Sequence, residues 1–331
     1  GTIANLEALW VARESHPGKR IAYSADAHYT HSRMCQVIGV EGVAIATDAA
    51  GRMDLATLER ELATGTVGTV VATLGTTGLG ALDPLPQIVA LARAHGARVH
   101  VDTAYGGFFA LIADDSADGV ARAPFAAIAD VDSIVVDPHK HGLQPYGCGA
   151  VLFADPSVGR FYVHDSPYTY FSSDELHLGE ISLECSRAGA AAAALWLTLE
   201  VIPLTDAGLG QVLRANRAGA REWAGLLAQS DALVAYQEPE LDIVTYFPRR
   251  DSMSAIDAAS HALFVDAAAL PPERQLHLAT YAVKPGGLAD RGHAVTADAQ
   301  VARIMRSTVM KPESAERIGD IHRTLEELSR A

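Results

Sequence analysis

The sequence Ser133-Ile-Val-Val-Asp-Pro-His-Lys140 joins a short apolar run to a polar turn that ends in lysine. The run Ser133–Val136 predicts a buried strand, with Lys140 just beyond its carboxyl end. Doubly wound α/β sheets bind their ligands at this edge. A lysine that is partly removed from water there has a lowered pKa and can act as a Schiff-base nucleophile. Taken alone, the pattern also fits an ordinary surface lysine that follows a strand.

A second motif of the same kind lies upstream, in Arg98-Val-His-Val-Asp102-Thr-Ala-Tyr-Gly-Gly107. It predicts another strand, which ends in an acid followed by small residues. In enzymes that use pyridoxal phosphate, a carboxylate pairs with the protonated ring nitrogen and keeps the ring an electron sink. Small residues such as Ala104 would let a flat ring lie against the backbone. The alternative is that Asp102 caps a helix that follows the strand.

Strand-like and helix-like segments alternate through the first half of the chain, which predicts βαβ units and a mostly parallel sheet. Ligand-binding groups would then meet at the carboxyl ends of the strands. The predicted strands are Ile21–Ser24, Gly42–Ala46, Val67–Thr73, Arg98–Val101, Ser133–Val136 and Ala150–Phe153, and the predicted helices are Leu55–Ala63 and Leu85–His95.

The pattern changes from Ala188 onward, where long helices precede a few strands. We therefore expect residues 1–200 to form a large domain and residues 201–331 to form linking helices and a small α+β domain. The stretch Ala188–Leu199 predicts a buried helix, and Gly286–Thr296 predicts a surface loop. Other predictions here are helices over 188–201, 209–227 and 313–328, and strands over 243–247, 276–283 and 303–309.

Composition excludes several classes of protein. The formal charge of −14 over 331 residues argues against binding to nucleic acid, which needs clustered Lys and Arg. No apolar run reaches the roughly 18 to 20 residues that a membrane helix needs. Three scattered cysteines indicate neither a disulfide framework nor a metal site. These features favour a cytoplasmic enzyme, and a first segment that reads as helix without a Met predicts that the natural start lies upstream.

The paired Asp102 and Lys140 motifs, 38 residues apart, resemble those of the group II pyridoxal-phosphate-dependent decarboxylases. This family includes the aromatic amino-acid, glutamate, histidine and diaminobutyrate decarboxylases. The resemblance implies the α/β architecture called fold type I, with pyridoxal 5'-phosphate held as a Schiff base on Lys140 and its ring nitrogen facing Asp102. It implies decarboxylation of an L-amino acid to an amine, without indicating which amino acid.

Three further motifs are similar to those of the family. Gly1-Thr2-Ile-Ala-Asn5 resembles a phosphate-binding turn at a helix N-terminus, where Thr2 would donate its hydroxyl. Ala27-His28-Tyr-Thr30 resembles the segment whose histidine stacks on the cofactor ring, which gives that role to His28. Thr73-Leu-Gly-Thr-Thr77-Gly78 implies that Thr77 lies near the ring or the substrate carboxylate.

The polar turn before Lys140 leaves two roles open. Asp137 stands where many relatives have Asn, and a carboxylate facing a phosphate would repel it, so Asp137 either turns away or caps a backbone group. His139 either contacts the phosphate or packs. The nearby His31, His100 and His141 are indistinguishable in sequence from structural histidines.

Two more resemblances lie further along, a basic motif at Cys185-Ser-Arg187 and an arginine of the C-terminal domain at Arg306. The aromatic segment between Lys140 and Arg187 resembles the start of a loop that the family supplies to the neighbouring subunit. That resemblance implies a homodimer and a tyrosine that returns a proton to the substrate carbon. Tyr168 is the first candidate and Tyr170 the second, and the alternative is interface packing.

Two other functions compete with decarboxylation. One is a different reaction on the same fold, such as aminotransfer, carbon–sulfur lysis or aldehyde synthesis. The other is a catalytically silent scaffold subunit, which would bind no cofactor.

Overall fold

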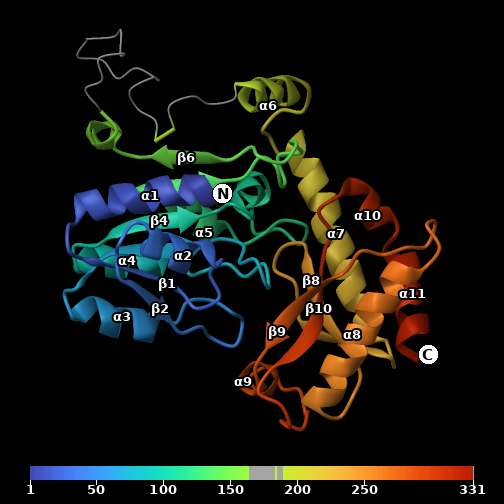
Figure 1. The fold of residues 1–331 in the computed structure, drawn as a ribbon. Coiled ribbons are helices and arrows are strands. Elements are labelled where there is room, and N and C mark those ends of the chain that lie inside the picture. The colour runs from blue at the N-terminus through green and yellow to red at the C-terminus, as the bar shows by residue number, and fades with distance from the viewer. Residues whose placement is uncertain (164–182, 185–188, 331) are drawn as a thin grey trace.

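The computed structural model describes residues 1–163, 183–184 and 189–330, which form a six-stranded sheet followed in sequence by a four-stranded sheet (Figure 1). The first sheet has the strand order β2-β1-β3-β4-β5-β6. All neighbours in it run parallel except β6, which pairs antiparallel to β5. The strands are β1 Arg20–Ser24, β2 Gly42–Ile45, β3 Val67–Thr73, β4 Arg98–Asp102, β5 Ser133–Val136 and β6 Ala150–Phe153. The predicted mostly parallel α/β sheet is confirmed.

Helices cover both faces of this sheet, because alternate residues of each buried strand point to opposite sides. On one face, helices α1 (Thr2–Ser15) and α2 (Thr30–Val37) pack on a cluster that includes Ile21 and Val71. On the other face, α3 (Leu55–Ala63) and α4 (Leu85–Ala94) pack on a cluster that includes Val70. The short elements α5 (Arg122–Ala126), η1 (Gly107–Ile112), η2 (Ala127–Asp130) and η3 (Pro156–Phe161) complete this half.

The C-terminal half is built on a fully antiparallel sheet of order β7-β8-β10-β9. The 20-residue helix α7 (Leu209–Ala228) leads into it and contributes Trp223 to its core and Leu213 to the core of the first half. The other elements are β7 Leu233–Gln237, β8 Ile243–Pro248, α8 Met253–Ala269, β9 Ala279–Val283, α9 Pro285–Ala289, β10 Ala302–Thr308, α10 Pro312–Glu316 and α11 Ile318–Arg330. The boundary at residues 200/201 between two domains stays a prediction.

Helix α6 (Ala190–Val201) corrects one expectation, since none of its residues is buried. It lies above the edge strand β6 (Figure 1), and Thr198 contacts Gln144 Nε2 at 2.8 Å. Trp196 is 64% exposed and Val201 is 74% exposed. The sequence is apolar around the whole helix, which is typical of buried helices, but within the described chain only one side of α6 faces the first half and the other side is exposed. No helix among the described residues is long and apolar enough to cross a membrane.

Two smaller expectations were also wrong. The predicted helix over 313–328 is divided into α10 and α11, with Arg317 between them. The predicted loop Gly286–Thr296 begins inside the short helix α9.

Candidate active site

The carboxyl ends of four neighbouring strands, β1, β3, β4 and β5, bring most of the predicted site residues to one edge of the first sheet. Thr73 at the end of β3 pairs with Asp102 at the end of β4, which in turn pairs with Val135 in β5. His28 follows β1, and Lys140 lies in the turn after β5. The order of the strands therefore joins motifs that lie far apart in the sequence.

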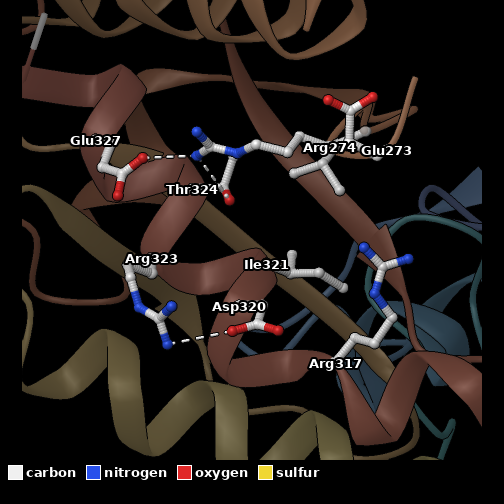
Figure 2. Close-up of a pocket in the computed structure, with 9 residues that line it drawn as sticks. Glu273, Arg274, Arg317, Asp320, Ile321, Arg323, Thr324 and Glu327 are labelled. Carbon is white, nitrogen blue, oxygen red and sulfur yellow. Dashed lines mark hydrogen bonds and ion pairs between the residues drawn. The ribbon is translucent and has the colours of Figure 1, made fainter. Parts of the chain in front are cut away.

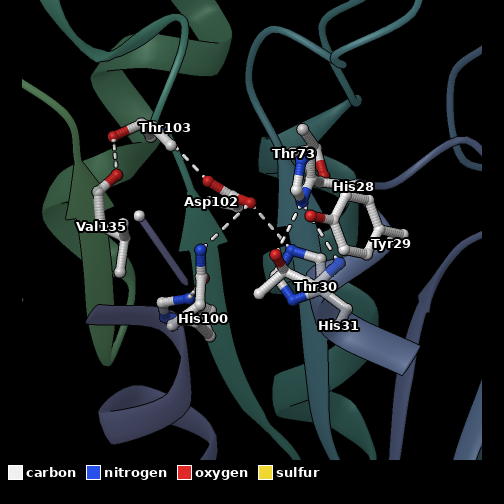
Figure 3. A network of polar contacts seen from close by, with 12 residues as sticks. His28, Tyr29, Thr30, His31, Thr73, His100, Asp102, Thr103 and Val135 are labelled. Carbon is white, nitrogen blue, oxygen red and sulfur yellow. Dashed lines mark hydrogen bonds and ion pairs between the residues drawn. The ribbon is translucent and has the colours of Figure 1, made fainter. Parts of the chain in front are cut away.

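Asp102 is 5% exposed and receives three hydrogen bonds from buried groups (Figure 3). His31 Nε2 lies 2.8 Å from Oδ2, the amide of Ala104 donates to Oδ1 at 2.9 Å, and Asn5 Nδ2 donates to Oδ2 at 3.4 Å. Burial by itself raises the pKa of Asp102, but the hydrogen bonds from His31 and Ala104 outweigh it and hold the pKa well below its usual range. Asp102 is therefore a buried carboxylate that stays ionised.

A second layer of polar residues orients the donors to Asp102. The Asn5 side-chain amide nitrogen donates to Asp102, so its oxygen faces His100 Nε2 at 2.9 Å and accepts a hydrogen bond from it. The other ring nitrogen of His100 then accepts from the Ser133 hydroxyl at 2.9 Å. Burial lowers the pKa of His100 to about 3, so the ring is neutral and fixed in one tautomer.

Lys140 is half-buried, and its Nζ lies 3.1 Å from Asp137 Oδ2. Asp137 Oδ1 lies 2.6 Å from the main-chain nitrogen of Gly1, at the start of α1. His139 Nε2 lies 3.5 Å from Asp137, while His139 Nδ1 donates to the carbonyl of Cys148 at 2.5 Å. Lys140 and the main-chain nitrogen of Gly1 thus offset the cost of burying the charge of Asp137.

His28 follows β1 and lies on the same edge of the sheet as Asp102 and Lys140. Burial lowers the pKa of His28, and the positive charge of Lys140 acts in the same direction while Asp102 opposes it. Nδ1 of His28 lies 2.7 Å from the hydroxyl of Thr30, which is itself 3.4 Å from the hydroxyl of Thr2. Thr2 is exposed at the first turn of α1.

Thr77 is exposed and contacts the C-terminal half of the chain, because its carbonyl accepts a hydrogen bond from Arg306 Nε at 2.5 Å. The turn that carries Thr77 packs backbone to backbone on the turn after β4. A Cβ on Gly106 would lie 2.2 Å from the carbonyl oxygen of Leu74, so only glycine fits at position 106.

Three of the predicted residues lie outside the described part of the chain. These are Tyr168, Tyr170 and Arg187. Their roles stay predictions.

The described residues fit pyridoxal phosphate at this edge. A carboxylate accepts about four hydrogen bonds, and Asp102 has three donors here, which leaves one position for a protonated ring nitrogen. Lys140 and His28 lie on the same edge as this carboxylate. The first amides of α1 have no partner within the helix and no side chain caps them, which suits a phosphate.

Two cavities lie elsewhere. One, of about 370 Å³, lies in the C-terminal half and is lined by charged side chains (Figure 2). Arg274 is paired there with Glu327, and Arg323 with Asp320, so opposite charges largely balance. The other, of about 330 Å³, is apolar and lies between α6 and the first half, with Phe108, Leu195 and Leu199 among its lining residues.

A family model described as "Pyridoxal-dependent decarboxylase conserved domain" matches residues 10–246 of the chain. The matched range contains His28, Asp102 and Lys140, which the geometry above brings to one edge. The chain belongs to the pyridoxal-dependent decarboxylase family. The predicted family and its cofactor are thereby confirmed.

Similar proteins are also amino-acid decarboxylases. The chain is 30% identical over 278 residues to an aspartate 1-decarboxylase of Aliivibrio fischeri, a match that covers 74% of this chain and 49% of that protein. It is 31% identical over 242 residues to an L-tyrosine decarboxylase of Enterococcus faecium, covering 61% and 40%. The chain thus spans about half the length of these relatives or less.

Solved structures show the same fold. The crystal structure of mouse CSAD matches with a TM-score of 0.81 at 23% identity, over 99% of this chain and 70% of that one. A structure of Oryza sativa TDC, crystallised with PLP and tryptamine, also matches with a TM-score of 0.81, at 18% identity and over 98% and 68% of the two chains. Fold type I is therefore confirmed.

Sequence reasoning missed two residues of this decarboxylase-family site, His31 and Asn5. His31 lies in α2, 71 residues before Asp102, and Asn5 lies 97 residues before it. A histidine one helical turn after His28 is a weak local signal, and the sequence around Asn5 offers none. Only the sheet order places them beside Asp102.

Proposed function

We propose that this chain is the catalytic part of an enzyme that removes the carboxylate of an L-amino acid as CO2. The observation that carries the proposal is the buried Asp102, held by His31 and the Ala104 amide, on the same sheet edge as Lys140 and His28. Bound pyridoxal phosphate supplies an electron sink for the electron pair left when the bond to the carboxylate breaks. The relatives named for aspartate, tyrosine and diaminobutyrate support this reaction class and leave the amino acid open.

The residues divide the work by position. Lys140 would hold the cofactor covalently, and its amine would release the product. Asp102 would keep the proton on the ring nitrogen, since its own pKa is low and its other donors are fixed. His28 would lie against the ring.

Separate groups would bind the phosphate of the cofactor and the carboxylate of the substrate. The Thr2 hydroxyl and the first amides of α1 would bind the phosphate. Asp137 holds Lys140 and the start of α1, and His139 packs between Asp137 and the Cys148 carbonyl. Thr77, whose carbonyl accepts from Arg306, would lie at the ring or the substrate carboxylate.

Proton return is the step we assign to Tyr168, with Tyr170 as the second candidate. A phenolic hydroxyl is the only proton that such a side chain can give. Tyr168→Phe should still release CO2, while the yield of amine falls and dissolved oxygen, by taking the electron pair that is no longer protonated, gives aldehyde and ammonia. If the Phe variants of both tyrosines make amine at the wild-type rate, these side chains only pack.

Trapping on Lys140 tests the proposal directly. The full-length protein, incubated with pyridoxal phosphate and reduced with borohydride, should carry the pyridoxyl group on Lys140, and Lys140→Ala should carry none there. A label on Lys19, Lys284 or Lys311 would overturn the assignment. The common L-amino acids, supplied one at a time, should then identify the substrate by CO2 release.

We also propose that the functional unit is a homodimer, with α6 in the interface. Exposed Trp196, Leu197 and Val201 form an apolar surface of the kind that protein partners cover. Trp196→Glu should shift the protein toward monomer in light scattering. Val37→Glu, at a side chain that is also 64% exposed but lies in α2, should leave the dimer intact. Equal dissociation in both variants, or a monomeric wild type, would contradict this.

A cytoplasmic location is the remaining part of the proposal. The described cysteines Cys35 and Cys148 are buried free thiols, which suits a reducing compartment. Fractionation of cells that express a tagged full-length protein would test it.

A further inference from the structure

A second buried network, separate from that of Asp102, links the first half of the chain to the second. The Tyr105 hydroxyl lies 2.6 Å from Asp242 Oδ1, and His141 Nε2 lies 2.7 Å from Asp242 Oδ2. His141 Nδ1 closes the ring of contacts at 2.9 Å from the carbonyl oxygen of Tyr105. The exposed fractions are 7% for Tyr105, 1% for His141 and 0% for Asp242.

The donors in this ring follow from chemistry. A carbonyl oxygen only accepts, so His141 Nδ1 must carry a proton. Burial, with the Asp242 carboxylate next in importance, raises the pKa of Tyr105 far above its usual range, so the hydroxyl stays protonated and donates. One further proton lies between His141 Nε2 and Asp242 Oδ2. Wherever that proton resides, the three groups together are neutral, which permits their complete burial.

The network is attached to the site at two points. Tyr105 follows Asp102 by three residues, and His141 is bonded directly to Lys140. The His141 ring is also held edge-on between the rings of Tyr105 and Phe109, at centroid distances of 4.7 and 4.9 Å. Asp242 immediately precedes β8 and belongs to the C-terminal half.

The turn that carries Lys140 is strained, so it needs such support. Leu143 has a φ of 59°, in the left-handed region that non-glycine residues seldom adopt. A Cβ on Gly142 would lie 2.7 Å from the carbonyl oxygen of Pro138, which shows how tightly the turn closes. A conformation of this kind persists only where the surroundings determine it.

We propose that Tyr105, His141 and Asp242 are positioning residues, which fix the Lys140 turn relative to Asp102 and dock it on the C-terminal half. The inference rests on the proposed function of Lys140. Apolar side chains of similar volume would stabilise the fold about as well as a buried charged cluster does. The cluster instead orients the Lys140 turn, because its contacts can form in only one orientation of that turn. A misplacement of about 1 Å at a reacting group can cost on the order of 10²-fold in rate.

The test measures how fast Lys140 captures added pyridoxal phosphate in the cofactor-free, full-length protein, by borohydride quenching at timed intervals and peptide mapping. Tyr105→Phe removes one buried hydroxyl from the network. Tyr246→Phe is the matched control, since Tyr246 is 0% exposed and its hydroxyl contacts Ser307 at 3.2 Å, away from Lys140. All variants are compared at a temperature where circular dichroism shows them folded.

We expect Tyr105→Phe to slow capture on Lys140 by about tenfold and Asp242→Asn by on the order of 10²-fold, with Tyr246→Phe at the wild-type rate. His141→Asn, whose amide can still donate to the Tyr105 carbonyl, should be slowed less than Asp242→Asn. In the loaded enzymes kcat should fall while KM stays unchanged. If Tyr105→Phe does not fold, Asp242→Asn is compared with the same control.

Equal capture by the network variants and Tyr246→Phe would overturn this inference alone, and the network would then only stabilise the fold. A wild-type protein whose label maps to a lysine other than Lys140 would overturn the proposed function and this inference with it. The two failures are therefore distinguishable in one experiment.

Discussion

Asp102 and Asp83 are buried carboxylates on either side of Thr73, and their pKa values are displaced in opposite directions. Asp102 pairs with Thr73 across the sheet, and Asp83 accepts from the Thr73 amide at 2.7 Å and from the Met53 amide at 2.7 Å. Burial raises the pKa of Asp83 to about 7, because two amide donors only partly counteract it. At Asp102 the additional donor His31 reverses the balance. Depth of burial therefore does not determine which acid stays ionised.

The difference matches the positions of the two groups. Asp83 ties the segment before α4 to that before α3, a structural contact for which charge is a cost. Asp102 is held ready for a cationic partner, which is what a protonated ring nitrogen would be.

The largest expected effect separates the two acids by function. Asp102→Asn should retain pyridoxal phosphate but lose several orders of magnitude in turnover, because a neutral ring is a poorer electron sink. Asp83→Asn should keep the wild-type kcat while the free energy of unfolding falls by about 1–3 kcal/mol, since an amide nitrogen would face a backbone donor. Steady-state kinetics and denaturant titration measure both. Unimpaired turnover in Asp102→Asn would contradict a catalytic role for Asp102, and with it the difference in function between the two acids.

A smaller effect on turnover is expected from His31, the additional donor that lowers the pKa of Asp102 but has no counterpart at Asp83. His31→Leu deprives Asp102 of a hydrogen bond to a charged acceptor, worth about 1.5–3 kcal/mol, so turnover should fall about tenfold to hundredfold. His31→Gln places an amide donor near the former Nε2 and should recover most of the loss. If Gln and Leu behave alike, the hydrogen bond is not the cause.

The two acids should also give stability opposite slopes with pH. The pKa of Asp83 in the folded chain, about 7, exceeds the ordinary value of 3.8, so the folded state binds the extra proton between these limits. Stability should therefore fall as pH rises from about 4 to about 7, by at most about 1.4 kcal/mol per pH unit. The pKa of Asp102 is lowered, so its contribution is complete above 3.8 and is lost at more acidic pH.

Urea unfolding across this pH range, on the wild type and Asp83→Asn, measures the difference. The variant should lose the decline between pH 4 and 7 and keep the acid branch. Parallel profiles for the two proteins would show that Asp83 is not the titrating group.

The smallest effect is expected from Asn5, whose contact with Asp102 is long at 3.4 Å. Asn5→Ala should lower turnover about twofold to tenfold, as the loss of about 0.5–1.5 kcal/mol implies. Asn216→Ala removes another buried asparagine, which donates to the carbonyl of Met310, and should alter stability without altering kcat. A loss of turnover common to both variants would point to a general folding defect.

The sequence predicts well the helices and strands that a local pattern of apolar residues determines, and the site residues that directly follow a strand. Helix α3 has the predicted bounds Leu55–Ala63, and the motifs around Asp102 and Lys140 lie at strand ends as expected. The period of apolar residues and the residue after each strand are local properties, so one chain suffices to see them.

Features that depend on distant or external partners were not predicted. His31 gained its role from a residue 71 positions away, and the environment of α6 cannot be inferred from a helix that is apolar on every side. Strand β7 and helix α8 were also missed. In α8 apolar residues occur all round, without the one-sided pattern that signals a helix on a core.

The link between Asp242 and the Lys140 turn has a consequence for how the protein is made. Tyr105 and Asp242 are 137 residues apart, and His141 and Asp242 are 101 apart. A nascent chain can build most of the parallel sheet before residue 242 leaves the ribosome, yet the lysine turn then lacks its support. Contacts of such long sequence separation form late and slowly. A newly synthesised chain should thus acquire its secondary structure first and its capacity to hold the cofactor in a distinct later phase.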